Sequence, residues 1–167
     1  MLQLLPAVKG LAMEGIVVKV IDGDSIKVLV DGIAREIRLY GIDTPEYKQP
    51  YSNKAKQFTK RIVDRQLVTV IKKDVDRYGR IVGVVISHGR IVNKELVREG
   101  LAWFYPRYCL EQPLCNEMKQ LEEMARTAQR GLWKDNDPVA PWDWKRQKKT
   151  SRPNEWRKWV YRLLSLL

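Results

Sequence analysis

The chain has 167 residues, of which 44% are hydrophobic and 31% are charged, a composition typical of one globular domain with a short extension. No apolar run approaches the ~20 residues that a membrane-spanning helix needs, so no transmembrane segment is expected. The formal net charge of +11 and the sequence pI of about 9.7 indicate an anionic partner.

The positive charge is concentrated at the C-terminal end of the chain. Residues 145–167 contain eight basic residues and one acidic residue, and they therefore carry +7 of the total +11. The body of the protein is only mildly basic. The charged C-terminal segment would be able to follow a nucleic-acid backbone without recognising its sequence.

The first part of the chain predicts three strands in a meander. Strands are expected over residues 15–21, 25–30 and 33–40, because apolar and polar residues alternate there. Asp31-Gly32 between the second and third strands is a strong hairpin signal, since both turn positions tolerate a positive φ. Three strands connected in this way form a strongly twisted sheet.

The sequence period then changes from two residues to that of a helix. An amphipathic helix is predicted by four apolar residues at helical spacing: Tyr51, Ala55, Phe58 and Ile62. Further strands are expected over residues 67–73 and 81–87, on either side of a polar turn. Five strands with a helix after the third predict an α+β fold built on a small OB-type barrel with one open groove.

About three helices are expected to pack beside this barrel. After the first helix, residues 92–103 contain a short helix that ends at Gly100, and a longer helix covers roughly residues 113–130. Residues 136–153 are rich in proline and charge and are predicted to be a basic linker. Residues 154–167 place apolar side chains at helical spacing and predict a terminal amphipathic helix.

The predicted organisation has four parts: an N-terminal extension (1–13), the barrel domain (14–135), the linker and the terminal helix. The amphipathic helix would pack on the body of the protein, contact a partner or lie at a membrane surface. A monomer is expected. Residues 1–15 match a signal peptide poorly, which favours the cytoplasm, with export to the periplasm or the medium as the alternative.

Cys109 and Cys115 lie close together in the sequence. Together with His88, the single histidine, they do not make a zinc site. They form either a short-loop disulfide, if the protein works outside a reducing compartment, or two buried free thiols.

Three short segments place polar side chains at predicted strand ends and turns: DGD (22–24), EIRLYGIDTPE (36–46) and DRYGR (76–80). Cleavage of a phosphodiester needs a hard cation, a base for water and positive groups where charge accumulates. Oxygen ligands from Asp24 and Asp43, with a backbone carbonyl such as that of Thr44, suit calcium or magnesium better than zinc.

The same segments supply the other groups that this reaction needs. Glu46 is a candidate general base, set apart from Asp43 by a rigid proline. Arg38 and Arg80 offer planar guanidinium groups for two-point contact with phosphate oxygens.

Counting along the predicted hairpin sets one geometric requirement. If Asp31-Gly32 is a two-residue turn, Ser25 faces Arg38, and Asp24 then points to the opposite face of the sheet from Arg38. A bulge or a strand end near Asp24 would bring the two side chains together, and Gly23 makes that plausible.

Four motifs in this order, VIDGDSIKV, IRLYGIDTPE, DRYGR and IVNKELVREGLAW, resemble the thermonuclease family, the staphylococcal-nuclease-like domains. The resemblance covers roughly residues 14–135. It implies an OB-fold barrel with helices beside it. It also implies calcium-dependent hydrolysis of DNA and RNA that leaves 3′-phosphate ends.

By matching positions, the resemblance implies a role for each candidate residue. Asp24 and Asp43 would be calcium ligands together with the Thr44 carbonyl, and Glu46 would activate water. Arg38 and Arg80 would bind the scissile phosphate and stabilise the pentacoordinate transition state.

Four further residues would contact the substrate. Arg77 and Tyr78 fall where the family has a phosphate-contacting lysine and tyrosine, and Tyr105 and Tyr108 would stack on bases. The loop after Glu46 is shorter than in the best-known member.

Two alternatives stay open at this point. One is a non-catalytic nucleic-acid-binding OB module, and the other is an accessory nuclease in plasmid maintenance. The enzyme is preferred because all five expected acids and arginines are present: Asp24, Arg38, Asp43, Glu46 and Arg80.

Overall fold

Five strands carry alternating apolar side chains, and burial of these side chains on one side closes the strands into a barrel. The computed structural model describes residues 12–150, and its long strands are β1 (Ala12–Val20), β2 (Ser25–Val30), β3 (Ile33–Leu39), β5 (Leu67–Val75) and β6 (Ile81–Ser87). Their order is β3-β2-β1-β5-β6, with antiparallel neighbours, and a parallel β3–β6 pairing closes the ring. Fully buried side chains inside include Val17, Ile26, Ile37, Val70 and Val85. The predicted five-stranded α+β barrel is confirmed.

Three further strands are short, and two of them form a separate small sheet. The two-residue strands are β4 (Ile42–Asp43), β7 (Arg90–Ile91) and β8 (Trp103–Phe104), and β4 pairs with β8. Asp31 and Gly32 both have positive φ values, 49° and 76°, and Val30 pairs with Ile33. The predicted two-residue hairpin is therefore confirmed.

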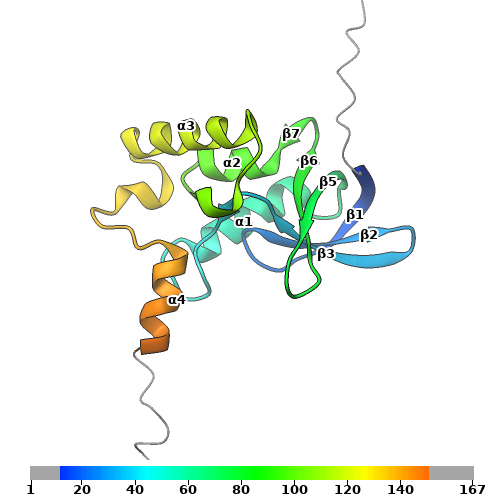
Figure 1. Cartoon of the computed structure of the whole chain (residues 1–167), viewed down its shortest axis with the longest axis horizontal. Helices are drawn as coiled ribbons and strands as arrows, with labels where there is room; N and C mark the ends of the chain where they lie inside the picture. The colour runs from blue at the N-terminus through cyan, green and yellow to red at the C-terminus, as the bar shows by residue number, and fades with distance from the viewer. Residues whose placement is uncertain (1–11, 151–167) are drawn as a thin grey trace, which may run out of the picture.

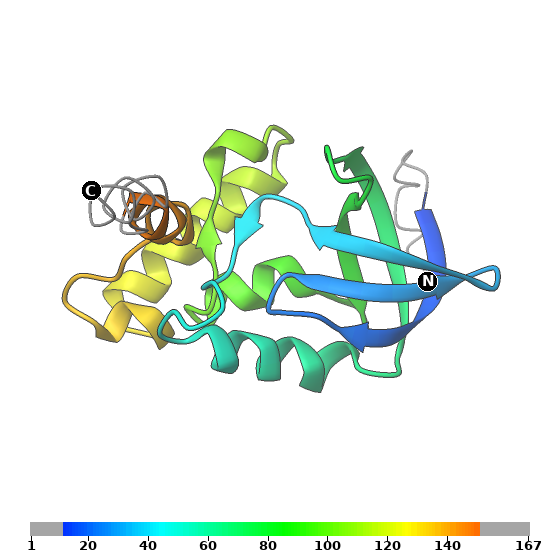
Figure 2. The ribbon, with the colours of Figure 1, turned by 90° about the horizontal axis from the view of Figure 1, so that it is seen from below.

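The helices lie to one side of the barrel and beneath it. They are α1 (Ser52–Val63), α2 (Val92–Arg98), α3 (Leu114–Thr127) and α4 (Pro141–Thr150), with 3₁₀ turns η1 (Pro106–Tyr108) and η2 (Gly131–Lys134). Helices α2 and α3 lie side by side (Figure 1), and α1 runs along the underside of the barrel (Figure 2).

The segment after the barrel domain differs from the sequence prediction. Residues 136–153 are predicted to be a linker, but the structure has helix α4 at Pro141–Thr150. Proline at the first helical position needs no N–H partner and has a suitable φ, and tryptophans alternate with charges behind it. The predicted amphipathic helix over 154–167 lies outside the described residues.

Buried polar side chains connect the helices to the strands. Asn93 at the start of α2 is fully buried; its amide donates to the Tyr40 carbonyl (2.9 Å) and accepts from the Val85 N–H (3.0 Å). The Thr59 hydroxyl of α1 donates to the Gly23 carbonyl (2.6 Å). Because buried polar groups are costly when unpaired, these bonds fix the helices relative to the strand ends.

Cys109 and Cys115 are joined by a disulfide. It connects the end of η1 to the first turn of α3. Of the two pairing states that the sequence leaves open, the structure has the disulfide.

Among residues 12–150, no helix has the length and apolar character needed to cross a membrane.

Candidate active site

Two buried carboxylates share one guanidinium group at the end of the β2–β3 hairpin. Arg38 Nη1 lies 2.7 Å from Asp24 Oδ2, and Arg38 Nη2 lies 2.6 Å from Asp43 Oδ1. Asp24 is 4% exposed and Asp43 is 3% exposed. Burial would lower the pKa of Arg38, but the charges of Asp24 and Asp43 outweigh it and raise that pKa. The guanidinium therefore stays charged between the two acids.

A strand end brings Asp24 and Arg38 together. Ser25 pairs with Arg38, as the hairpin count predicts, but Asp24 lies in the bend before β2. Its carbonyl still accepts the N–H of Leu39 (2.8 Å), while its side chain turns toward Arg38. The sequence analysis allows either a bulge or a strand end near Asp24 to bring its side chain to Arg38, and the structure has the strand end.

Thr44 fixes the orientation of the Asp24 carboxylate. Its N–H and its hydroxyl both donate to Asp24 Oδ2, at 2.6 and 2.8 Å. The approach is close because residue 23 is glycine: a Cβ there would lie 2.8 Å from the Thr44 hydroxyl oxygen. A side chain at this position would push the DGD bend away from Thr44.

The site carries more negative than positive charge. Arg38 interacts electrostatically with four carboxylates, Asp22, Asp24, Asp43 and Glu46, and the positive charges of Arg38 and Lys145 act to lower the pKa of Asp43. Burial, followed by repulsion from Asp24, raises the pKa of both Asp22 and Asp43 to about 7. Asp24 and Asp43 beside Arg38 leave one buried negative charge in excess, and Asp22 and Glu46 add carboxylate oxygens on the more exposed side. An acidic, oxygen-rich site of this kind suits a divalent cation.

The donor set fits a hard cation that keeps part of its water shell. Within residues 12–150 no group of three or more His, Cys, Asp or Glu side chains is arranged to hold a metal ion. The groups that would supply the protein's share are the carboxylates of Asp24 and Asp43 and the Thr44 carbonyl. Calcium accepts six to eight oxygen ligands, so water and a phosphate oxygen would complete the shell.

Arg80 lines the same cleft as Arg38 and is held there by its own turn. Its Nε donates to Asp76 Oδ2 (2.7 Å), and Asp76 Oδ1 accepts the N–H groups of Tyr78 and Arg80 at 2.9 and 3.0 Å. Burial would raise the pKa of Asp76, but the hydrogen bonds from the Arg80 side chain and from the Arg80 and Tyr78 N–H groups together outweigh it and lower that pKa. Asp76 therefore stays ionised and orients Arg80.

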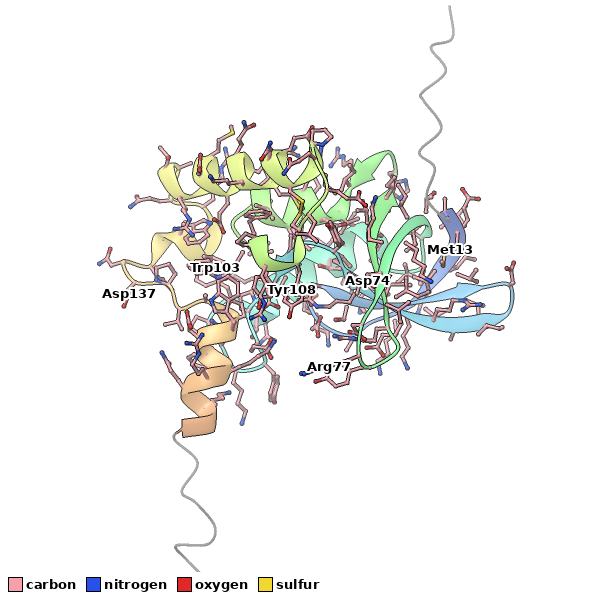
Figure 3. All side chains as sticks on the ribbon, viewed as in Figure 1. Met13, Asp74, Arg77, Trp103, Tyr108 and Asp137 are labelled. Carbon is pink, nitrogen blue, oxygen red and sulfur yellow. A yellow bond between two sulfur atoms is a disulfide. The ribbon has the colours of Figure 1, made fainter. Side chains whose placement is uncertain are left out.

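Most of the predicted site residues line one cleft of ≈ 530 Å³. Its walls include Arg38, Asp43, Arg77, Tyr78, Arg80, Tyr105 and Tyr108. Figure 3 shows Arg77 at the tip of the β5–β6 turn and Tyr108 on the segment before α3. Three predicted site residues, Asp24, Thr44 and Glu46, do not line the cleft. Asp24 and Thr44 connect to it through Arg38, and Glu46 connects to it through its ion pair with Lys145.

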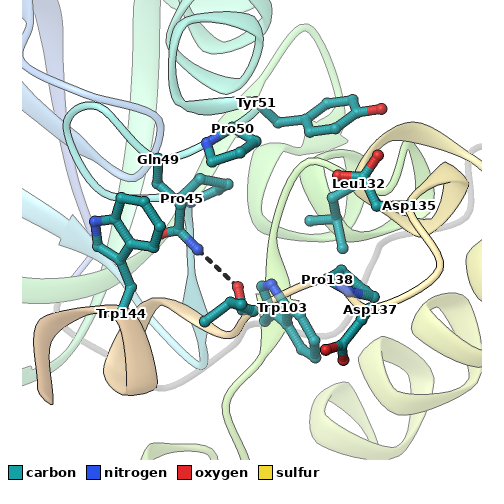
Figure 4. A pocket seen from close by; sticks show the side chains of 11 residues that line it. Pro45, Gln49, Pro50, Tyr51, Trp103, Leu132, Asp135, Asp137, Pro138 and Trp144 are labelled. Atoms are coloured by element: carbon teal, nitrogen blue, oxygen red, sulfur yellow. Dashed lines mark hydrogen bonds between the residues drawn. The ribbon is translucent and has the colours of Figure 1, made fainter. Parts of the chain in front are cut away.

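Glu46 is held between the loop that follows β4 and helix α4. Its Oε1 lies 2.7 Å from Lys145 Nζ, and its backbone N–H donates to Gln49 Oε1 (2.9 Å). Gln49 Nε2 in turn donates to the Val139 carbonyl (2.6 Å), as Figure 4 shows. The predicted base is thus positioned by residues far along the chain.

Three aromatic residues, Tyr105, Tyr108 and Trp142, line one part of the cleft, named the aromatic wall. Trp142 belongs to helix α4. The Trp142 ring stacks on Tyr105 with centroids 4.6 Å apart and planes 14° apart, and Tyr105 meets Tyr108 edge-on at 4.9 Å. One face of Tyr105 is therefore covered. A base that stacks on Tyr105 would have to use the other face.

Several residues of the site are absent from the sequence prediction. Asp22 and Asp76 stand in motifs that the sequence analysis singles out, so their proximity to the site could have been expected. Gln49, Trp142 and Lys145 carry no local signal, because their roles depend on contacts with distant segments.

These contacts define a class of protein: an OB-type barrel with paired acids and arginines beside a basic, aromatic cleft. Residues 36–135 match the family described as staphylococcal nuclease homologue. The chain therefore belongs to the staphylococcal nuclease family, as the motifs predict.

Individual relatives cover most of the chain. An uncharacterized endonuclease of Escherichia coli is 43% identical over 137 residues, which are 81% of this chain and 87% of that protein. Protein ParB of Escherichia coli is 39% identical over 149 residues (84% and 83%). Micrococcal nuclease of Shigella flexneri is 38% identical over 146 residues (82% and 83%).

Proposed function

We propose that this protein, a nuclease by family, is a calcium-dependent phosphodiesterase. Its substrates would be DNA and RNA, cleaved with little sequence preference to leave 3′-phosphate ends. The observation that carries the proposal is the excess of buried negative charge around Arg38, at the edge of a cleft lined by arginines and aromatic rings.

Asp24, Asp43 and the Thr44 carbonyl would hold the calcium ion. Bound calcium supplies positive charge to a phosphate oxygen and lowers the pKa of water. The protein prepares this site by fixing Asp24 with two hydrogen bonds from Thr44. It also keeps Arg38 between the two carboxylates, so that part of their charge is compensated before any substrate arrives.

Glu46 would take the proton from the attacking water. Its side chain is 33% exposed, so water reaches it, while its backbone is held by Gln49. In-line attack places the nucleophile and the leaving oxygen on opposite sides of the phosphorus. Arg38 and Arg80 would stabilise the charge on the remaining oxygens, since planar guanidinium groups contact two phosphate oxygens at once.

The lining of the cleft supports weak sequence preference. Arg77 and Tyr78 lie together, with the Arg77 guanidinium 4.8 Å from the Tyr78 ring centroid, and both are exposed. Guanidinium groups and aromatic rings bind phosphates and base faces, which all nucleotides share.

Digestion of plasmid DNA and RNA tests the proposal. The full chain should cleave both with calcium and neither with excess chelator, and the new 3′ ends should need phosphatase treatment before a polymerase extends them. Glu46→Gln should lower kcat by roughly 10²-fold, a typical loss for a general base.

Glu123→Gln is the matched control, because Glu123 is an exposed glutamate of α3 that does not line the cleft. It should cleave at the wild-type rate. A near-normal rate for Glu46→Gln, or activity that persists in chelator, would contradict the proposed mechanism.

A further inference from the structure

Helix α4 lies beyond the residues that match the family, yet it forms one wall of the cleft. The family match ends at residue 135, whereas α4 covers Pro141–Thr150. Its Trp142 and Lys145 line the same cleft as Arg38 and Arg80. This wall therefore includes a helix that follows the residues matched by the family model.

The segment that leads into α4 is anchored to the loop that carries Glu46. Gln49 is 6% exposed, and its amide joins the Glu46 N–H to the Val139 carbonyl. Trp144 and Pro45 line a small pocket beside this bond (Figure 4). The start of α4 is thus fixed relative to the site by a partly buried hydrogen bond and by packing.

Lys145 is placed for contact with an anion in the cleft. Its Nζ lies 2.7 Å from Glu46 Oε1, and its side chain is 52% exposed. It also interacts electrostatically with Asp43. An ammonium group has three donors, so one carboxylate oxygen leaves donors available on the exposed side.

We propose that Lys145 is a phosphate-binding residue of the cleft, which contacts a backbone phosphate of the nucleic-acid strand beside the scissile bond. The proposal rests on the proposed function. It goes beyond that function because it assigns a substrate contact to a helix outside the family match.

Electrostatics gives the reason for a cation at this place. The acids that surround Arg38 repel a polyanion, and a lysine next to Glu46 reduces this repulsion on the side that faces α4. When a phosphate enters, the ammonium exchanges one oxyanion partner for another, so its charge is compensated throughout. The exchange also releases Glu46 Oε1 toward water.

The aromatic stack keeps Lys145 at the cleft. Trp142 precedes Lys145 by three residues, so both side chains lie on one side of α4. Because Trp142 stacks on Tyr105, this side of the helix is held against the cleft wall. The basic side chain is therefore presented to the cleft.

Binding to a short labelled single-stranded DNA, measured by fluorescence anisotropy in chelator over a range of salt concentrations, tests the assignment without catalysis. Lys145→Gln should make the slope of log K against log salt shallower by about 0.7, the value for one phosphate contact on a single strand. Lys119→Gln is the charge-matched control, since Lys119 is exposed on α3 and does not line the cleft; its slope should stay at the wild-type value.

Kinetics with calcium gives the second readout. Lys145→Gln should raise KM about tenfold and change kcat less than about twofold, as expected when one charge-assisted contact of about 1.4 kcal/mol is removed. Lys145→Arg keeps the positive charge, so its KM should stay close to the wild-type value.

Other results would contradict either the role of Lys145 or the proposed function. An unchanged salt slope, or an equal change in Lys119→Gln, would overturn the assignment, and so would a rise in kcat, which would show that Lys145 restrains Glu46. A wild-type chain without nuclease activity would instead overturn the proposed function, and the salt slope in chelator would still decide the role of Lys145.

Discussion

The two sides of the site, the barrel wall and the α4 wall, are built in different ways. On the barrel side, Asp24 and Asp43 are almost fully buried and share Arg38. On the α4 side, Glu46 and Lys145 form one partly exposed pair that joins a loop to a helix. Buried charges are costly unless all are compensated, so the barrel wall has one stable arrangement. The Glu46–Lys145 pair of the α4 wall is partly exposed to solvent, so each charged group can exchange its partner.

The largest loss of stability is expected when the barrel wall loses its central cation. Arg38→Ala removes the cation between two buried carboxylates and should lower the free energy of unfolding by about 3–5 kcal/mol, as measured by urea denaturation. Arg80→Ala serves as the control, because the Arg80 side chain is 28% exposed and its ion pair contributes less, about 1 kcal/mol or below.

Both arginine variants should lose turnover, by roughly 10²-fold or more. If Arg38→Ala and Arg80→Ala lower the free energy of unfolding equally, the buried Arg38 pairs do not contribute more to stability than the partly exposed Arg80 pair.

A smaller effect comes from the disulfide at the far end of the aromatic wall. Replacement of both cysteines by serine should lower the free energy of unfolding by about 2 kcal/mol, because the bond closes only a short loop. The disulfide joins Cys109, next to Tyr108, to α3, so KM should rise while the Asp24–Arg38–Asp43 arrangement stays intact.

Reductant should reproduce the loss of stability in the wild-type protein and leave the serine variant unchanged. If reductant leaves the wild-type protein equally stable, the disulfide does not contribute to its stability.

The smallest effect is a dependence of stability on pH. In the metal-free protein, the pKa values of Asp22 and Asp43 are raised to about 7 from an ordinary 3.8. The folded state therefore binds protons more tightly than the unfolded chain, and the stability that these groups contribute is complete below the unfolded pKa and is lost as pH rises through 7.

Urea denaturation in chelator at about pH 5 and about pH 8 should show this loss, on the order of 1 kcal/mol. Asp43→Asn should reduce it. Calcium affinity should increase over the same interval, because binding requires the ionised carboxylates. A loss of the same size in Asp43→Asn would contradict the role of Asp43.

The barrel wall could be predicted from sequence to a large extent. Asp31-Gly32 sets the hairpin, and the hairpin sets the pairing of Ser25 with Arg38. The sequence also indicates an irregularity near Asp24. It could not show that this irregularity is a strand end and not a bulge, because the bend depends on the contact of Gly23 with Thr44 and α1.

Helix α4 and its contacts with the site could not be predicted from the sequence, for a physical reason. The helix is rich in charge and begins with proline, so its local pattern resembles a linker. The contacts that order it, Trp142 on Tyr105 and Gln49 on Val139, are tertiary. No periodicity in the sequence encodes them.

One amide side chain has a practical consequence for protein engineering. Gln49 bridges segments 90 positions apart, and its acceptor lies past residue 135, where the family match ends. A fusion or graft that stops at that boundary would leave the amide nitrogen without its acceptor and remove the lysine that faces Glu46. The smallest transplantable unit of this enzyme therefore extends through α4.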